Sequence, residues 1–385
     1  MALHDDGDIS HLSFVRSVDL VDSMIEEAVR IGVSDIHIEP LDRCVRIRYR
    51  LDGVLVPVNT FPLEQLDKIT SRIKIKSDLD IANKRLPQDG RLRWSQDGRN
   101  IDMRVSTMPT VRGEKTVIRL LDSGSIPLDL EKLGFTEQIV AILRTMIHRP
   151  KGLILLCGPT NSGKTTTLYA ALHELDTKQI SIATLEDPVE YKLEGICQSQ
   201  INVKAGLLFH NGLRALLRQD PDILVIGEIR DKETASIAIR AALTGHLVFS
   251  TIHAGSALET PIRLMDMGIE PYMIADALLG VLSQRLVRRL CCHCRQVNDT
   301  TGYEGSYVHT GCPHCFGTGY AGRVGIGEIV PVNKSLRCAI RDTANLELLQ
   351  EAAARDGALF MGQSICDVLR AGETDWQEIQ RMFTE

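Results

Sequence analysis

The chain contains the stretch Gly158-Pro159-Thr160-Asn161-Ser162-Gly163-Lys164-Thr165. It spells G-x-x-x-x-G-K-[ST], the pattern of a phosphate-binding loop. An apolar run over residues 153–157 precedes it and indicates a buried strand, and a helix is expected from Lys164 to Leu175. Glycines let such a loop wrap a polyphosphate with backbone N–H groups at the helix N-terminus. The pattern would arise by chance in about one chain in a hundred of this length. The flanking strand and helix argue against that alternative, so the sequence predicts a nucleotide site.

Two side chains of the loop are expected to act on the nucleotide directly. Lys164 should reach the β- and γ-phosphates, and the Thr165 hydroxyl should ligate Mg²⁺. The predicted contacts with ATP are Gly158, Pro159, Thr160, Asn161, Ser162, Gly163, Lys164, Thr165 and Thr166.

Four apolar segments alternate with helical ones after about residue 131, as in a parallel sheet. They cover residues 153–157, 180–185, 223–226 and 247–250, and each runs into polar residues at its C-terminal end. Ligands of open α/β sheets bind at that edge. One active site built from four strand ends is therefore expected.

Acidic residues follow two of these strands. Glu228 ends the run that begins at Asp222, and we assign it to the Mg²⁺ that accompanies ATP. The alternative is a structural ion pair with Arg230. Glu186 ends the strand before it, and we assign it as the base that orients and deprotonates the attacking water.

A fourth strand end carries Ser250, Thr251 and His253. These side chains could sense the γ-phosphate or carry a proton, and we include His253 among the catalytic candidates. A purely structural histidine is the alternative.

The cysteines of the C-terminal third form two C-x₂-C pairs separated by seventeen residues. This spacing is typical of a structural zinc site with four thiolate ligands. The expected ligands are Cys291, Cys294, Cys312 and Cys315. Cys292, His293 and His314 are additional donors, so the choice of four ligating atoms stays open.

The first 120 residues read as a separate α+β domain. Alternating apolar residues in 45–51 and 101–105 indicate half-exposed strands, with turns at Asp52-Gly53 and Asp97-Gly98. Between the two segments we expect a helix that carries Leu63, Leu66, Ile69 and Ile73 on one side. We predict domains at residues 1–121 and 131–385 with a linker at 122–130. Residues 291–323 would form the cysteine module, and Thr374 to Gln377 a capping box that opens the last helix.

Composition restricts the function further. The net charge is −6 and aromatics make up 4% of the chain, which argues against a nucleic-acid surface. No signal peptide or apolar run of 18 residues is present in the sequence, which predicts a cytoplasmic protein with reduced cysteines.

Together these motifs resemble the ATPases of type II secretion and type IV pilus assembly, over nearly the whole chain. Residues 34–40 and 85–91 resemble signatures of the domain before the ATPase core in that family. Residues 158–165, 186–188, 222–235 and 245–253 resemble its Walker A motif, aspartate box, Walker B region and histidine box. The tetracysteine element resembles the module of assembly members, which retraction ATPases generally lack.

The resemblance implies a RecA-like ATPase domain, a preceding PAS-like α+β domain and a small zinc-binding module. It implies a homo-hexamer that hydrolyses ATP with Mg²⁺ to drive pilus extension or pseudopilus assembly. Arg104 and Arg119 occupy positions at which the N-terminal domain supplies arginines to the nucleotide; solvated arginines on a strand are the alternative. The expected partners are an inner-membrane platform protein and, indirectly, prepilin-like subunits, with the ring peripherally bound at that membrane.

The sequence also departs from the family pattern. Ala254-Gly255 follows His253 where the family tends to have Thr-Asn, and the chain opens close to the middle domain of longer members. We therefore expect recruitment through other surfaces or a different partner. Two alternatives remain: a DNA- or conjugation-associated hexameric ATPase, which the acidic charge disfavours, and a regulatory nucleotide-binding module without turnover, which the pair Glu186 and Glu228 disfavours.

Overall fold

The computed structural model describes residues 17–96, 98–121, 128–175, 177–298, 307–342 and 345–384. The chain divides into two compact units, Met1–Ile126 and Pro127–Glu385, and each is described by itself. Asp97 of the predicted turn and residues 122–127 of the predicted linker lie outside the described residues. None of the helices in the described ranges combines the length and apolarity needed to cross a bilayer.

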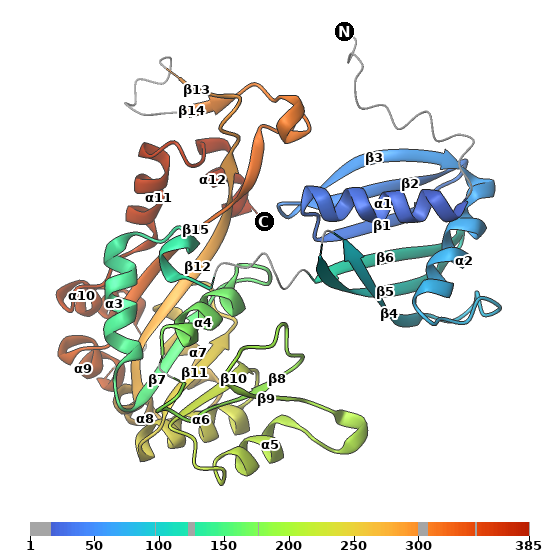
Figure 1. Ribbon diagram of the computed structural model, residues 1–385. Helices are drawn as coiled ribbons and strands as arrows, with labels where there is room; N and C mark the ends of the chain where they lie inside the picture. The colour runs from blue at the N-terminus through green and yellow to red at the C-terminus, as the bar shows by residue number, and fades with distance from the viewer. Residues whose placement is uncertain are drawn as a thin grey trace. The chain divides into compact units, whose positions relative to one another are not determined.

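The first unit is an antiparallel sheet with two helices on one face (Figure 1). Its strand order is β3-β2-β1-β6-β5-β4. The elements are α1 Ser17–Ile31, β1 Asp35–Pro40, β2 Cys44–Leu51, β3 Val54–Pro62, α2 Leu66–Lys76, β4 Gln88–Gln96, β5 Arg99–Thr110 and β6 Gly113–Leu121. Ile47, Ile101, Met103 and Val105, which the sequence pattern predicts on the buried side of their strands, lie in the core of this unit. Leu66, Ile69 and Ile73 of α2 join them, whereas Leu63 lies before the helix and is exposed.

The second unit is a seven-stranded mixed sheet of order β15-β12-β7-β11-β10-β8-β9. The four predicted strands are β7 Gly152–Cys157, β8 Ile182–Glu186, β10 Ile223–Ile229 and β11 Leu247–Ile252. They are neighbours and parallel, so their C-terminal ends meet at one edge. The sheet is completed by β9 Cys197–Gln200, β12 Leu278–Leu290 and β15 Tyr320–Pro331.

Helices cover both faces of this sheet, as expected for buried parallel strands. The helices α3 Glu137–Ile147 and α4 Lys164–His173 pack on one face. Leu130, the last residue of the predicted linker, is fully buried in that layer. The opposite face is covered by α5 Phe209–Leu216, α6 Lys232–Thr244, α7 Glu259–Asp266, α8 Pro271–Ala277, α9 Lys334–Asp342 and α10 Leu346–Arg355.

The hairpin of β12 and β15 extends beyond the rest of the sheet (Figure 1). Its far part packs against α11 Met361–Arg370 and α12 Trp376–Thr384 and leads to β13 Arg295–Val297 and β14 Tyr307–His309. The predicted capping box at Thr374 is wrong by one residue. Asp375 caps α12 by accepting from the backbone N–H of Glu378 at 2.9 Å, while the Thr374 hydroxyl donates to the carbonyl of Arg288.

Candidate active site

The phosphate-binding loop lies between β7 and α4, as the sequence predicts. Positive φ angles at Gly158 (143°), Asn161 (63°) and Gly163 (88°) curl its backbone, a conformation that favours glycine. A Cβ at Gly158 would stand 2.5 Å from the carbonyl oxygen of Gln284, so a larger residue does not fit there. The Ser162 hydroxyl is buried and has no hydrogen-bond partner among the described residues. The loop therefore has the curled backbone and the spare polar atom that a phosphate group requires.

Lys164 and Thr165 begin α4 directly after the loop. The Lys164 ammonium donates to the carbonyls of Gly158 and Pro159, at 2.9 and 2.8 Å. Burial lowers the pKa of Lys164. It is half-buried, and among the described residues its hydrogen bonds go to these two carbonyls, so this cation is available to a phosphate that enters the loop.

Glu228 lies at a break in the pairing of β10 with β11, between the pairs Ile226–Ser250 and Ile229–Ile252. Its carboxylate binds the Arg230 guanidinium and lies 3.7 Å from Nε2 of His253. The structure thus forms the Glu228–Arg230 ion pair that the sequence left as an alternative. His253 is more than half exposed, at 55% of its side chain.

Glu186 at the end of β8 is buried and held by three donors. Oε1 accepts from the Thr184 hydroxyl at 2.6 Å and from Nε2 of Gln198 at 3.3 Å. Oε2 accepts from the Tyr169 hydroxyl of α4. Burial, together with this carboxylate, raises the pKa of Tyr169. Both oxygens of the predicted base are therefore occupied by protein groups here.

The two acidic strand ends lie close together because Gly227, the residue next to Glu228, has no side chain to hold them apart. A Cβ at Gly227 would stand 3.2 Å from Cα of Glu186, tighter than an ordinary contact. Ser250 and Thr251 of β11 support the same corner, since their hydroxyls donate to the carbonyls of Ile226 and Gly227, both at 2.8 Å. In this structure both hydroxyls bond to the backbone of the neighbouring strand β10, and their suggested part in sensing the γ-phosphate stays a prediction.

Sequence reasoning missed the residues that β12 brings to the loop. Nε2 of Gln284 donates to the carbonyl of Ser162 at 2.6 Å. Arg285 donates from Nη2 to the carbonyl of Gly255 at 2.8 Å. The apolar run of residues 278–282, followed by Ser283, Gln284 and Arg285, was the available signal. The pairing of β12 with β7 is a tertiary contact that this run does not reveal.

Arg104 and Arg119 belong to the first unit, where they face each other on the paired strands β5 and β6. Arg119 donates to the buried carboxylate of Asp35 at 2.9 Å. Arg50 reaches the same carboxylate at 3.6 Å. These residues lie on the sheet face opposite the helices, because their strand neighbours Ile36, Met103 and Ile118 point into the core.

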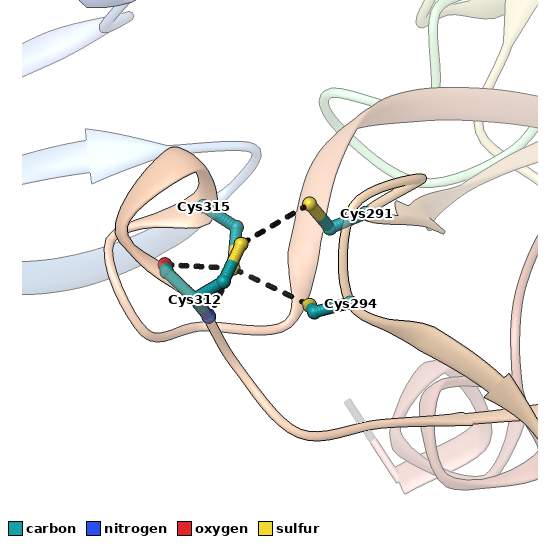
Figure 2. A group of neighbouring side chains, drawn as sticks. All are labelled: Cys291, Cys294, Cys312 and Cys315. Atoms are coloured by element: carbon teal, nitrogen blue, oxygen red, sulfur yellow. Dashed lines mark hydrogen bonds between the residues drawn. The ribbon is translucent and has the colours of Figure 1, made fainter.

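The four predicted cysteines form one cluster (Figure 2). Their sulfurs lie within 4.8 Å of one another, and the Cys291–Cys312, Cys294–Cys315 and Cys312–Cys315 sulfurs are 3.8, 3.8 and 3.7 Å apart. A tetrahedral zinc with bonds of ~2.3 Å places its sulfurs about 3.8 Å apart, so the geometry fits this ion.

The backbone also supports a thiolate in this cluster. The Sγ of Cys315 accepts from the amides of Cys312 and Gly319, both at 3.2 Å. Burial opposes ionisation, but these amides outweigh it and lower the pKa of Cys315 to about 7. Cys292 is exposed, and the rings of His293 and His314 stack on each other with centroids 4.1 Å apart. None of these three residues belongs to the cluster.

Comparison with known proteins assigns the chain to a family. The family model described as "Type II/IV secretion system protein" matches residues 12–381. The chain belongs to this family. It is a secretion ATPase of the type II class, and the resemblance drawn from its motifs is confirmed.

Relatives of this secretion ATPase span most of its length. It is 47% identical over 376 residues to "Type II secretion system protein E" of Pectobacterium carotovorum subsp. carotovorum, covering 95% of this chain and 75% of the relative. It is 44% identical over 380 residues to "Type II secretion system ATPase E" of Vibrio cholerae, covering 96% and 75%.

Solved structures share the α/β fold predicted from the sequence. The pilus retraction motor PilT, solved with bound ADP, is 27% identical, with a TM-score of 0.63 and coverage of 94% of this chain and 96% of PilT. The ATPase DotB of Legionella pneumophila is 19% identical, with a TM-score of 0.70 and coverage of 95% of both chains, and supports the fold alone.

Proposed function

We propose that this secretion ATPase hydrolyses Mg²⁺-ATP and uses the energy to power pseudopilus assembly in a type II secretion system. The observation that carries the proposal is the curled loop at the end of β7 beside two carboxylate-bearing strand ends of the same sheet. Relatives at 42–48% identity carry type II secretion names, which favours secretion over pilus extension.

The residues of the loop and its neighbours have different roles in the proposed hydrolysis. Lys164 would exchange its carbonyl acceptors for the β- and γ-phosphate oxygens, while Thr165 and Glu228 would hold Mg²⁺, which would neutralise charge on those phosphates. Glu228 must then loosen its ion pair with Arg230. His253, which lies beside Glu228, contributes to the same polar cluster.

Glu186 orients the attacking water and accepts its proton. Because Tyr169, Thr184 and Gln198 occupy both carboxylate oxygens, at least one of these bonds must open when water binds. Arg104 and Arg119 of the first unit would supply positive charge to the nucleotide. Arg119 would then give up its bond to the Asp35 carboxylate, and Arg50 would remain as the cation beside that carboxylate.

The cysteine cluster would hold Zn²⁺ in a closed four-thiolate site, where the ion stabilises the fold and does no chemistry. We further propose a homo-hexamer at the cytoplasmic side of the inner membrane, bound to a platform protein. Prepilin-like subunits would be moved indirectly through that platform.

Steady-state ATP hydrolysis by the purified protein and three variants tests the site. Lys164→Ala should lower kcat at least about 100-fold, because it removes charge that stabilises the transition state. Glu186→Gln should lose hydrolysis yet bind a fluorescent ATP analogue. Glu228→Gln should need more Mg²⁺ for half-maximal rate.

Glu194→Gln serves as the matched control, because Glu194 is an exposed acid near Glu186 in sequence. Its rate should equal that of the unaltered protein. Full hydrolysis by Lys164→Ala, or by Glu186→Gln, would refute the roles assigned to these residues.

A further inference from the structure

A cavity of about 500 Å³ lies in the second unit, away from the phosphate-binding loop. It is lined by the second half of α3 and the loop after it, the start of β12, the end of β15, α9 and the turn that follows α10. β7 and β12 begin at this edge, whereas the phosphate-binding loop follows the end of β7. A six-residue strand spans about 20 Å, so the cavity and the nucleotide site are distinct.

The cavity is positively charged. Arg149, Lys151 and Arg337 line it, and Asp356 is the acid among the lining residues. The Asp356 carboxylate is already engaged, since it accepts from the backbone amides of Ser335 and Leu336 at 3.2 and 2.9 Å. Burial raises the pKa of Asp356, but hydrogen bonds from Leu336, Ser335 and Asn333 outweigh this and lower it. The three cations therefore exceed the negative charge within the lining.

Arg337 gives the clearest sign of a missing ligand. Its Nε is buried and has no acceptor within the described part of the chain. No ion pair of Arg149, Lys151 or Arg337 with a described carboxylate is present. A desolvated guanidinium donor without an acceptor is costly, and its planar geometry matches the oxygens of a phosphate or carboxylate.

The remaining lining restricts the ligand further. Ile142, Met146, Leu279 and Val332 form an apolar wall beside the cations. The lining residues include no aromatic ring on which a nucleobase could stack. The volume lies in the range of sites for small organic molecules.

We propose that this cavity binds a phosphate ester, with the phosphate on Arg337, Arg149 and Lys151 and the organic part on the apolar wall. Two sources share this chemistry: a soluble phosphate ester and the headgroup of an anionic phospholipid. Three cations suit the charge of a phosphate group, and the apolar wall distinguishes an ester from free phosphate.

Phenyl phosphate is a suitable probe of the soluble source. Binding is measured by calorimetry in the full chain carrying Lys164→Ala, which removes the main phosphate contact of the nucleotide site. Arg337→Ala in that background should weaken binding at least tenfold, the loss expected for a charge-assisted hydrogen bond. Arg337→Lys should restore part of it. Arg240→Ala, which alters an exposed arginine of α6, should leave binding unchanged.

The second arm measures sedimentation with vesicles of phosphatidylcholine alone and of equimolar phosphatidylcholine and phosphatidylglycerol. One supporting outcome is that the protein does not bind phenyl phosphate but sediments with the phosphatidylglycerol vesicles, and that Arg337→Ala abolishes this sedimentation. This outcome would identify the lipid headgroup as the source. If neither probe binds, or if Arg337→Ala and Arg240→Ala bind alike while circular dichroism shows both folded, the proposal is overturned.

Discussion

Tyr169 connects two parts of the candidate active site through one side chain. It belongs to α4, the helix that begins at Lys164, and its hydroxyl binds the Glu186 carboxylate on β8. Its ring also packs edge-on against Tyr191, with centroids 5.2 Å apart. A shift of α4 on nucleotide binding would therefore move the group that orients Glu186.

We expect Tyr169→Phe to lower kcat about tenfold, because one oxygen of a buried carboxylate loses its donor. The KM for ATP should change less than about twofold, since the hydroxyl does not touch the phosphate-binding loop. ATPase kinetics measure both values. Tyr272→Phe, on an exposed tyrosine, is the control, and an unchanged kcat in Tyr169→Phe would remove Tyr169 from this role.

Glu39 of β1 provides a prediction about pH. Its burial raises the pKa, but hydrogen bonds from Arg48, Lys115 and Arg46 outweigh this and lower the pKa to about 2, from an ordinary value of 4.5. The carboxylate therefore stabilises the folded state fully above pH 4.5, and this contribution is lost as the pH falls towards 2.

Glu39→Gln should lower the free energy of unfolding by about 2 kcal/mol at pH 7. The difference from the parent should shrink as the pH falls below 4.5. Urea unfolding followed by Trp94 fluorescence in a Trp376→Phe background reports on the first unit, because Trp94 is on β4. Glu64→Gln, on an exposed acid, should show no such difference; a constant gap across pH would contradict the assignment.

At the scale of elements, much of the second unit was predictable from the sequence. β7, β8, β10 and β11 are buried apolar runs, and their polar C-terminal residues marked the edge where they meet. Gln198, Tyr169 and Gln284 were not predictable, because each acts through a partner at least 12 residues away in sequence. The start of α12 was misplaced because Thr374 and Asp375 both suit a cap, and a bond to distant Arg288 decides between them.

A substitution at Gly227, where the pairing of β10 with β11 is interrupted, should affect both stability and activity. A Cβ in Gly227→Ala would press on the backbone of Glu186, and we expect a loss of about 1–2 kcal/mol in unfolding free energy together with slower hydrolysis. Gly362→Ala in α11 meets no atom within 4 Å and should instead stabilise by about 0.5 kcal/mol. Thermal unfolding and ATPase assays compare the two, and equal effects would contradict the packing argument.

At the scale of the whole molecule, we expect the cysteine cluster to depend on a bound metal ion for its stability. Within the described residues, the Cys291 amide donates to the Gly319 carbonyl and so links the two C-x₂-C turns, while Arg295 donates to the Gly372 carbonyl outside the cluster. Zinc would supply the remaining stabilisation.

Cys294→Ser should therefore abolish stoichiometric zinc in the purified protein and lower its unfolding temperature by several degrees, by about 4 °C or more. Zinc is measured by atomic absorption after dialysis. Cys292→Ser is the matched control, because this neighbouring thiol is exposed and outside the cluster, and it should retain the metal. Zinc loss in Cys292→Ser instead would overturn the ligand set.

The β12–β15 hairpin has a mechanical consequence. Residues 278–283 of β12 are anchored on β7, whereas residues 284–290 have β15 as their strand partner and run on to Cys291. These seven residues beyond β7 span about 23 Å. A tilt of about 10° at the anchored root would carry the tip through about 4 Å by geometry alone. The hairpin, with α11 and α12 packed on its far part, thus connects the nucleotide loop to the cysteine cluster, so a tilt at its root would displace that cluster.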